Sequence, residues 1–397
     1  MQSNVGLVIE EKAADIGNFM VGRLLPFRKK RAVGPFVFID HMGPACLEDH
    51  QNLDVPPHPH IGLSTLTYLL EGAIHHRDSL GNSIEILPGA VNWMTAGKGI
   101  RHSERTPQRL RSKDKFLHGF QLWIALPKEL EESNPTFNHT PASDIPHWIY
   151  EGVHYKLIAG KIKDIESPVP VHSPMYFLEI KSNETKTVAI GDQLYGETAL
   201  YVLKGEVEIE GNRYGTKQLL VAKESTLCNF KLIGDSVVYI FGGEALAEER
   251  FMFWNFVSSD KEKLEQAKRY WKDQNTEVFP LIPEDNATYV PLPEPHHKIK
   301  NTGMEIKRTE DEKRGKFTIY EDHTPAGEMT YVWAGSNKFI IDHTGTFEGY
   351  SGKGYGKKLV HAGVAFARER EVKIIPLCPY AKKVIEGDES LHDVLYR

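Results

Sequence analysis

The fold class is decided by the stretch LTYLLEGAIHH, residues 66–76. Two short apolar runs lie on either side of Glu71-Gly72, a dipeptide suited to a tight turn. A third run, Ile84 to Leu87, follows a second turn at Gly81-Asn82. Short strands joined by such turns predict a meander of antiparallel strands.

The same pattern recurs 133 residues further along the chain. Residues 68–74, YLLEGAI, align with residues 201–207, YVLKGEV. This offset is the length of one small β-barrel domain, and the flanking patterns agree. We therefore expect two tandem antiparallel β-barrels.

Two short clusters in the first half have the spacing of metal ligands: His58-Pro59-His60 and His102-Ser103-Glu104. Residues i and i+2 of a strand face the same side, so each cluster directs two ligands at one place. Imidazoles and one carboxylate, without a thiolate, suit Fe(II), Mn, Ni, Cu or Zn and leave positions open for oxygen or a substrate. The alternative for a lone His-x-His is a surface feature, and the second cluster argues against it.

Other histidines are interpreted differently. His75-His76 and Asp40-His41 are neighbours on strands and face opposite sides, so we interpret them as wall or surface residues. At the 133-residue offset, His58 and His60 correspond to Gly191 and Gln193. The second barrel is therefore expected to be metal-free.

Composition argues against several classes of partner. The chain has 397 residues and a formal net charge of -6. It therefore lacks the excess of positive charge expected of a protein that binds nucleic acid or an anionic membrane. The basic run Arg28 to Arg31 is interpreted as a solvated loop. Three separated cysteines, Cys46, Cys228 and Cys378, do not form a disulfide framework. With no signal peptide and no apolar stretch of about 18 residues, we expect a cytoplasmic protein.

The length predicts several domains. We expect a first barrel over residues 1–135, a second over 136–290, a Pro-rich linker over 291–303 and a C-terminal α/β domain over 304–397. A helix near the end of the second segment is predicted from a capping box, Ser259 with Glu262. Its apolar positions are Leu264, Ala267 and Trp271.

The C-terminal segment alternates strands, a glycine-rich turn, a helix and a last strand. The turn, Gly352-Lys353-Gly354-Tyr355-Gly356, enters a helix and exposes backbone N–H groups that suit a phosphate. A purely structural turn is the alternative. Cys378 follows the last strand, and a thiol near a histidine can attack a thioester. A small buried side chain is the alternative for an isolated cysteine.

The first part of the chain resembles the pirins, which are bicupins of the cupin superfamily. The resemblance rests on residues 34–44, 58–62, 94–104 and 118–123. It implies one iron-like centre held by His58, His60, His102 and Glu104. It also implies quercetin 2,3-dioxygenase activity on a small aromatic flavonol, with Glu104 accepting the hydroxyl proton. Other pirins resemble redox-sensing regulators that bind protein partners, which is the alternative function.

The C-terminal segment resembles the small GCN5-related acetyltransferase-like proteins. The resemblance rests on residues 317–320, 341–344, 352–356 and 374–380. It implies acetyl-CoA bound with its pyrophosphate on residues 352–356, with His343 and Cys378 near the thioester. Ser351 departs from the Gln or Arg that the larger superfamily prefers, and the acetyl acceptor stays open. The resulting fold class is a mainly β bicupin with an α/β acetyltransferase-like domain.

Overall fold

The computed structural model describes residues 4–16, 19–223, 229–285, 287–293, 305–311, 313–321, 324–351 and 353–396. Cys228, Gly352 and residues 294–303 of the expected linker lie outside these ranges. The chain divides into two compact units, Met1–Leu292 and Pro293–Arg397. In the described ranges, no helix has the length and apolar character needed to cross a membrane.

The first barrel is built from two antiparallel sheets. One sheet has seven strands in the order β12-β9-β6-β11-β4-β3-β2, and the other has four in the order β5-β10-β7-β8. The strands are β2 Lys12–Asp15, β3 Met20–Leu25, β4 Phe36–Leu47, β5 Asp54–His60, β6 Leu63–Glu71, β7 Ile74–Asp78, β8 Ser83–Ile86, β9 Val91–Thr95, β10 Ile100–Arg105, β11 Lys115–Ala125 and β12 Thr136–Thr140. The three predicted strands are present as β6, β7 and β8, but the continuous meander is wrong: β7 and β8 form an antiparallel hairpin, whereas β6 lies in the other sheet.

Gly72 makes the turn between β6 and β7 possible. Its φ is +87°, and a Cβ there would lie 2.2 Å from the carbonyl oxygen of Phe116. Only glycine fits such a backbone position without displacing its neighbour.

The second barrel is one ten-stranded sheet with the main order β1-β20-β18-β21-β16-β14-β13. Its strands are β1 Val5–Glu10, β13 His147–Tyr150, β14 Val153–Ile162, β15 Ile165–Glu166, β16 Met175–Ser182, β17 Lys186–Ala189, β18 Glu197–Ile209, β19 Asn212–Tyr214, β20 Gln218–Ala222 and β21 Asn229–Gly243. The internal repeat is confirmed by strand neighbours. β6 lies between β9 and β11, and β18 lies between β20 and β21.

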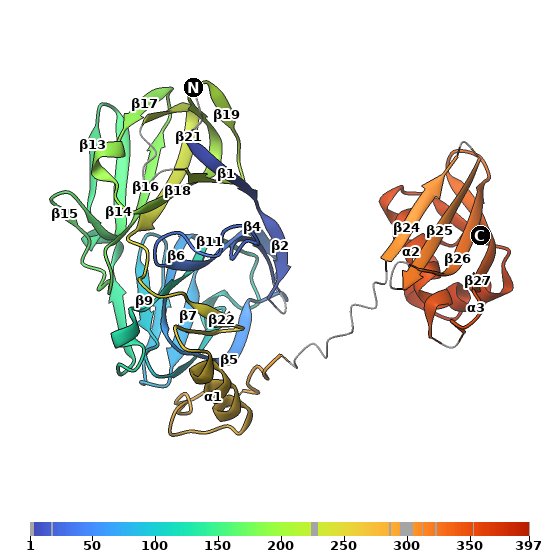
Figure 1. Ribbon diagram of the computed structural model, residues 1–397, viewed down its shortest axis with the longest axis horizontal. Helices are drawn as coiled ribbons and strands as arrows, with labels where there is room; N and C mark the ends of the chain where they lie inside the picture. Colours follow the sequence, from blue (N-terminus) through green and yellow to red (C-terminus); the bar gives the residue numbers. More distant parts are fainter. Residues whose placement is uncertain are drawn as a thin grey trace. The chain divides into compact units, whose positions relative to one another are not determined.

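Both barrels contain strands from either side of residue 135. The N-terminal strand β1 pairs with β20 and lies within the second barrel in Figure 1, whereas β2 pairs with β3 of the first. β12 pairs with β9 of the first barrel. The late hairpin of β22 Phe251–Phe253 and β23 Phe256–Ser258 also joins the first barrel, because the Val257 amide donates to the Ile61 carbonyl at 3.2 Å.

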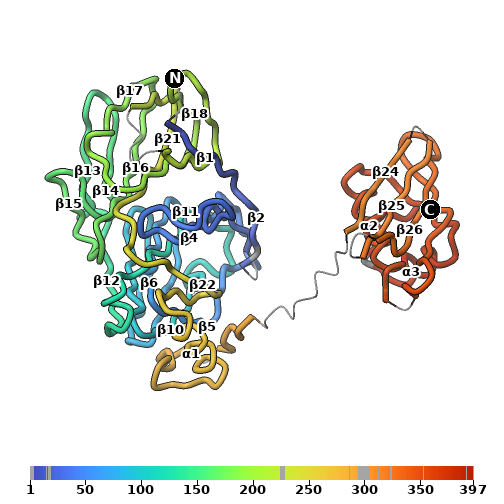
Figure 2. The backbone as a smooth tube through the Cα atoms, in the orientation of Figure 1, coloured from blue at the N-terminus to red at the C-terminus, as the bar shows by residue number. Residues whose placement is uncertain are grey.

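Helix α1, Lys261–Lys272, packs on the first barrel beside β5 and β10 (Figure 2). Leu264, Ala267 and Trp271 are its buried residues, as predicted. The predicted cap is wrong by one residue, because Asp260 is the N-cap and its carboxylate accepts from the Glu262 amide at 2.8 Å. The Ser259 amide instead donates to Glu131 at 2.7 Å.

The two barrels share a buried polar network. Glu11, between β1 and β2, contacts His41 Nδ1 through Oε1 at 2.6 Å, and the Tyr201 hydroxyl donates to the same carboxylate. His41 Nε2 lies 2.9 Å from His118 Nε2. One network therefore links β4 and β11 of the first barrel to β18 of the second.

This network predicts a loss of stability in mild acid. Burial, together with the nearby His41, lowers the pKa of His118 to about 4. The unfolded chain takes up that proton at pH of about 6.5, so the free energy of unfolding should fall as the pH drops from 6.5 towards 4. Urea unfolding at several pH values measures this slope. His118→Gln should make the slope less steep while the buried histidines such as His58 keep their share, and an unchanged slope in the variant would contradict the assignment.

The C-terminal unit is an α/β sandwich, as predicted. Its sheet runs in chain order: β24 Glu305–Glu310, β25 Arg314–Glu321, β26 Thr324–Trp333, β27 Lys338–Thr346 and β28 Lys373–Pro376. The β27–β28 pair is parallel, and the crossover between these two strands is α2, Tyr355–Glu369. Helix α3, Pro379–Glu386, follows. The sequence pattern did not predict β24.

Candidate metal centre

Three of the expected ligands come together in the first barrel. β5 and β10 pair antiparallel, with His102 opposite His58 and Ile100 opposite His60. One nitrogen from each of the three histidines lies within 4.8 Å of the others. His58 is 7% exposed, and His60 and His102 are each 1% exposed. The strand pairing therefore gathers three imidazoles in a buried place.

Two of these rings carry a buried nitrogen that lacks a hydrogen-bond partner in the described part of the chain: His60 Nδ1 and His102 Nε2. His58 Nδ1 donates to the Pro56 carbonyl at 2.9 Å, which leaves the lone pair on its Nε2. Burial lowers the pKa of His58 to about 4 and those of the other two well below their ordinary value. Buried unpaired nitrogens are costly, and neutral imidazoles that converge in this way fit a divalent transition metal.

Glu104 lies in a second, overlapping group. A register shift between His102 and Glu104 places Glu104 opposite Val55 of β5. Its carboxylate is within 4.8 Å of nitrogens of His76 and His102. Burial raises the pKa of Glu104, and the Thr67 hydroxyl lies 3.4 Å away. The bulge thus directs the expected carboxylate ligand toward β7.

His76 is a residue of this centre that sequence reasoning missed. Of its two interpretations, that of a surface residue is wrong, because His76 is 4% exposed; it lies in the group with His102 and Glu104. β7 pairs with β10 so that His76 lies opposite Glu104. The only signal in the sequence was the neighbouring pair of histidines, because the register that brings β7 to β10 is a tertiary property.

A segment after α1 covers the outer side of the histidine strands. Asp285 accepts from Ser103 Oγ at 2.6 Å and from Arg105 Nη2 at 3.0 Å. The Val290 amide donates to the Pro57 carbonyl at 2.9 Å. Ser103 and Arg105 alternate along β10 with His102 and Glu104, so the segment holds the opposite face of that strand.

We expect Asp285→Ala to destabilise the first barrel. The change removes hydrogen bonds to a charged side chain that is 4% exposed, and such bonds are each worth about 1.5–3 kcal/mol. Urea unfolding should show a loss in that range. Asp192→Ala, which removes an exposed ion pair with Lys163, is the matched control and should change little. Equal effects in both variants would refute a holding role for Asp285.

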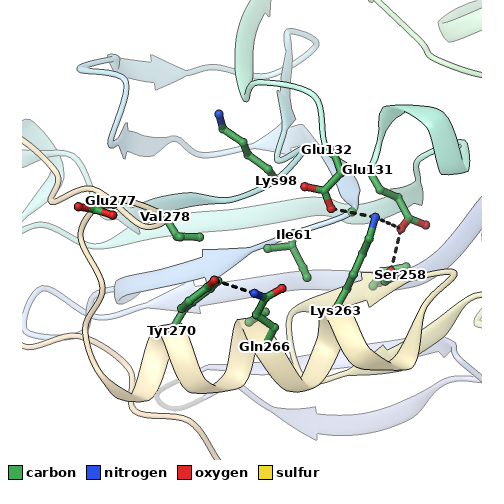
Figure 3. Close-up of a pocket in the computed structure, with 13 residues that line it drawn as sticks. Ile61, Lys98, Glu131, Glu132, Ser258, Lys263, Gln266, Tyr270, Glu277 and Val278 are labelled. Carbon is green, nitrogen blue, oxygen red and sulfur yellow. Dashed lines mark hydrogen bonds and ion pairs between the residues drawn. The ribbon is translucent and has the colours of Figure 1, made fainter.

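A polar cavity of about 370 Å³ lies nearby, between α1 and the first barrel (Figure 3). Ile61 and Gly62, which follow His60, line one side of it. Lys263 reaches from α1 toward Glu131 and Glu132, at 3.7 and 2.8 Å. None of His58, His60 and His102 is among the residues that line this cavity.

The C-terminal candidates are placed as follows. Gly354 is the N-cap of α2 with φ +75°, and Lys353 pairs with Glu321 at 2.8 Å. Tyr355 and Gly356 begin the helix, and a Cβ on Gly356 would lie 2.8 Å from the ring of Tyr380. The loop residues described therefore do lead into a helix N-terminus, as expected.

His343 lies in β27, whereas Cys378 follows β28 and is the N-cap of α3. The Cys378 amide donates to the Ile341 carbonyl at 2.9 Å, and the side chain is buried. His343 is exposed, and its Nε2 is 3.0 Å from where a Cβ on Gly345 would be. The His343 imidazole therefore points along β27 toward Gly345. Cys378 instead contacts β27 at Ile341, two residues before His343.

Comparison with known proteins identifies the family. The Pirin family model matches residues 18–124, and the Pirin C-terminal cupin domain model matches residues 177–277. A pirin-like protein of Caulobacter vibrioides is 44% identical over 293 residues, which are 73% of this chain and 100% of that protein. The chain belongs to the pirin family. Its two barrels are accordingly the two cupins of a pirin.

Other relatives of this pirin carry an enzyme name. A Pseudomonas aeruginosa protein provisionally named quercetin 2,3-dioxygenase is 36% identical over 67% of this chain and 83% of that protein. The crystal structure of quercetin 2,3-dioxygenase from Acinetobacter baumannii aligns with a TM-score of 0.67 and 31% identity, over 72% of this chain and 94% of that one. The family model of GCN5-related N-acetyl-transferase matches residues 316–394. The predicted bicupin with an acetyltransferase-like C-terminal domain is confirmed.

Proposed function

We propose that the pirin part of the chain is an oxygenase with one divalent metal ion that acts on a small aromatic substrate of the flavonol type. Fe(II) is the ion that we propose first. The observation that carries this proposal is the convergence of three buried, neutral imidazoles with unpaired nitrogens. The enzyme names of two relatives support the substrate class. Mn, Ni, Cu and Zn suit the same donors.

The residues of the centre have separate tasks in this proposal. His58, His60 and His102 would hold the ion, with Glu104 as the fourth ligand. A bound divalent ion supplies Lewis-acid chemistry and a template for a hydroxyl or carbonyl oxygen. The Glu104 carboxyl, whose pKa burial raises, suits a general base for the substrate hydroxyl proton.

A second function is favoured by the burial of the centre. An oxygenase needs an open cavity beside the metal, whereas a sensor works with a nearly sealed one. The three histidines are between 1% and 7% exposed. A metal-dependent regulator that binds a protein partner according to the redox state of its iron is therefore the alternative.

Aerobic bleaching of quercetin by the full chain, loaded in turn with Fe(II), Mn, Ni, Cu and Zn, tests the oxygenase. We expect turnover with at least one ion and none with a His58→Ala variant. If no loaded form turns quercetin over while metal still binds, the oxygenase proposal fails on flavonols and the regulator remains. Comparing proteolysis of the Fe(II) and Fe(III) forms then tests the regulator, which requires a difference between them.

For the C-terminal domain we propose acetyl-CoA binding, with the pyrophosphate on the loop before α2 and His343 and Cys378 near the thioester. The family match and the left-handed Gly354 at a helix N-terminus support this. N-acetyltransferase activity is part of the proposal, and the acceptor is not specified. Calorimetric titration of the full chain with acetyl-CoA tests the binding site.

A further inference from the structure

We propose that His76 is a positioning residue of the metal centre, which, with Asp78, fixes His102 in the tautomer that presents Nε2 to the ion. This inference rests on the proposed metal centre and adds two residues to it. The proposed chain runs from Asp78 through His76 to His102, across the neighbouring strands β7 and β10. Asp78 and His76 are two residues apart on β7 and so face the same side.

Asp78 is the fixed end of the chain. Its side chain is fully buried and accepts from the amides of Leu80 and Asn82 at 2.9 and 3.1 Å. The Asn82 side-chain amide also donates to it, at 2.9 and 3.0 Å. A carboxylate surrounded by N–H donors is ionised and only accepts. His76 Nε2, 3.0 Å from Asp78 Oδ2, must therefore carry a hydrogen.

That hydrogen determines the other nitrogen of His76. In the neutral ring, Nδ1 is then a bare acceptor, and it lies 3.4 Å from His102 Nδ1. The reverse arrangement, with a hydrogen on His76 Nδ1, would make the ring a cation. His102 would then have to carry its own hydrogen on Nε2, which is buried and has no hydrogen-bond partner in the described structure, so this arrangement leaves a buried N–H unsatisfied.

The consequence falls on His102. If its Nδ1–H donates to His76, its Nε2 carries the lone pair, and this is the nitrogen that has no partner in the described structure. His58 is held in the same tautomer by a different acceptor, because its Nδ1–H donates to the Pro56 carbonyl and leaves the lone pair on Nε2. Outer-shell acceptors of this kind orient ligating imidazoles and raise their basicity.

The ring of His76 is also held in place by packing. It stacks on Phe137 of β12 with centroids 4.5 Å apart and planes at 17°. This stacking provides a conservative variant, because a phenylalanine at position 76 keeps the ring contact while removing both nitrogens. Asparagine at the same position restores an acceptor oxygen near the place of Nδ1.

The test is Co(II) affinity, measured by competition with a chelator, together with the Co(II) absorption spectrum. We expect His76→Phe to bind Co(II) about 10–100-fold more weakly, with a changed spectrum, as for other outer-shell partners. His76→Asn should recover most of the affinity. His75→Phe is the matched control, because His75 faces the other side of β7 and pairs with Ser83 at 2.9 Å. Thermal unfolding of the metal-free variants reports whether they fold.

The outcomes separate this inference from the proposals on which it rests. Wild-type affinity and spectrum in folded His76→Phe would overturn it, as would equal losses in the Phe and Asn variants. A wild-type chain that binds no Co(II), or a His58→Ala variant that binds as tightly as wild type, would overturn the metal centre itself. Failure to bleach quercetin affects only the oxygenase proposal, because the affinity measurement does not involve turnover.

Discussion

His102→Ala is expected to abolish metal binding by the full chain and, with it, any quercetin turnover. His102 is the one residue common to both groups of candidate ligands, His58–His60–His102 and His76–His102–Glu104. Its removal leaves neither of these groups of three donors intact. The loss of affinity should therefore exceed the about 10–100-fold that removal of an outer-shell partner costs.

Stability measurements give this prediction a second readout. A ligand that binds only the folded state stabilises it by about 2.7 kcal/mol when its concentration is 100 times its dissociation constant. Wild type should gain melting temperature on addition of metal, and His102→Ala should gain none. The change also removes a buried nitrogen that has no hydrogen-bond partner in the described residues, so loss of that polar atom adds no cost to the metal-free protein.

The control for His102→Ala is His75→Ala, an imidazole on the outer side of the same barrel. It should keep the metal stoichiometry of the wild type and its melting shift. Retention of metal by His102→Ala at wild-type affinity would refute the proposed centre. Loss of metal in both variants would show that binding depends on the general stability of the barrel rather than on these donors.

The barrels were predictable because their signals are local. Turn dipeptides such as Glu71-Gly72 and the period of two along β6 specify strands within a few residues of sequence. The repeat placed Tyr68 and Tyr201 in equivalent strands, and both are 1% exposed. The common face of His58 and His60 likewise follows from their i and i+2 spacing alone, because side chains alternate along any strand.

What escaped prediction depends on pairing between distant strands. Glu104 turns toward His76 because of a bulge in β10, and no property of residues 102–104 alone reveals that bulge. Asp285 meets Arg105 only after the chain has completed both barrels. β1 joins the second barrel although it begins the chain. Register and topology of this kind are tertiary properties that local patterns do not encode.

Gly354→Val is expected to weaken acetyl-CoA binding to the C-terminal domain by at least about tenfold, if the loop before α2 holds the pyrophosphate. Gly354 has φ +75° at the N-cap, a conformation that a β-branched residue adopts only with strain. Apart from its chain neighbours and the adjoining helix backbone, no described residue has an atom within 4 Å of the position its Cβ would take, so a valine side chain there would enter open space. Strain and bulk would both displace the amides that face a phosphate.

Gly335→Val separates a local effect on the loop from a general loss of stability. Gly335 also has positive φ, +90°, and open space around it, so the backbone strain is similar. Gly335 precedes β27, whereas the loop follows it, so a nine-residue strand of about 30 Å lies between the two positions. Calorimetry of the full chain with acetyl-CoA should show weak binding for Gly354→Val and wild-type binding for Gly335→Val. Equal affinities in the two variants would contradict the proposal that the loop binds the pyrophosphate. A wild-type chain that binds no acetyl-CoA would contradict the proposal that the domain has an acetyl-CoA site.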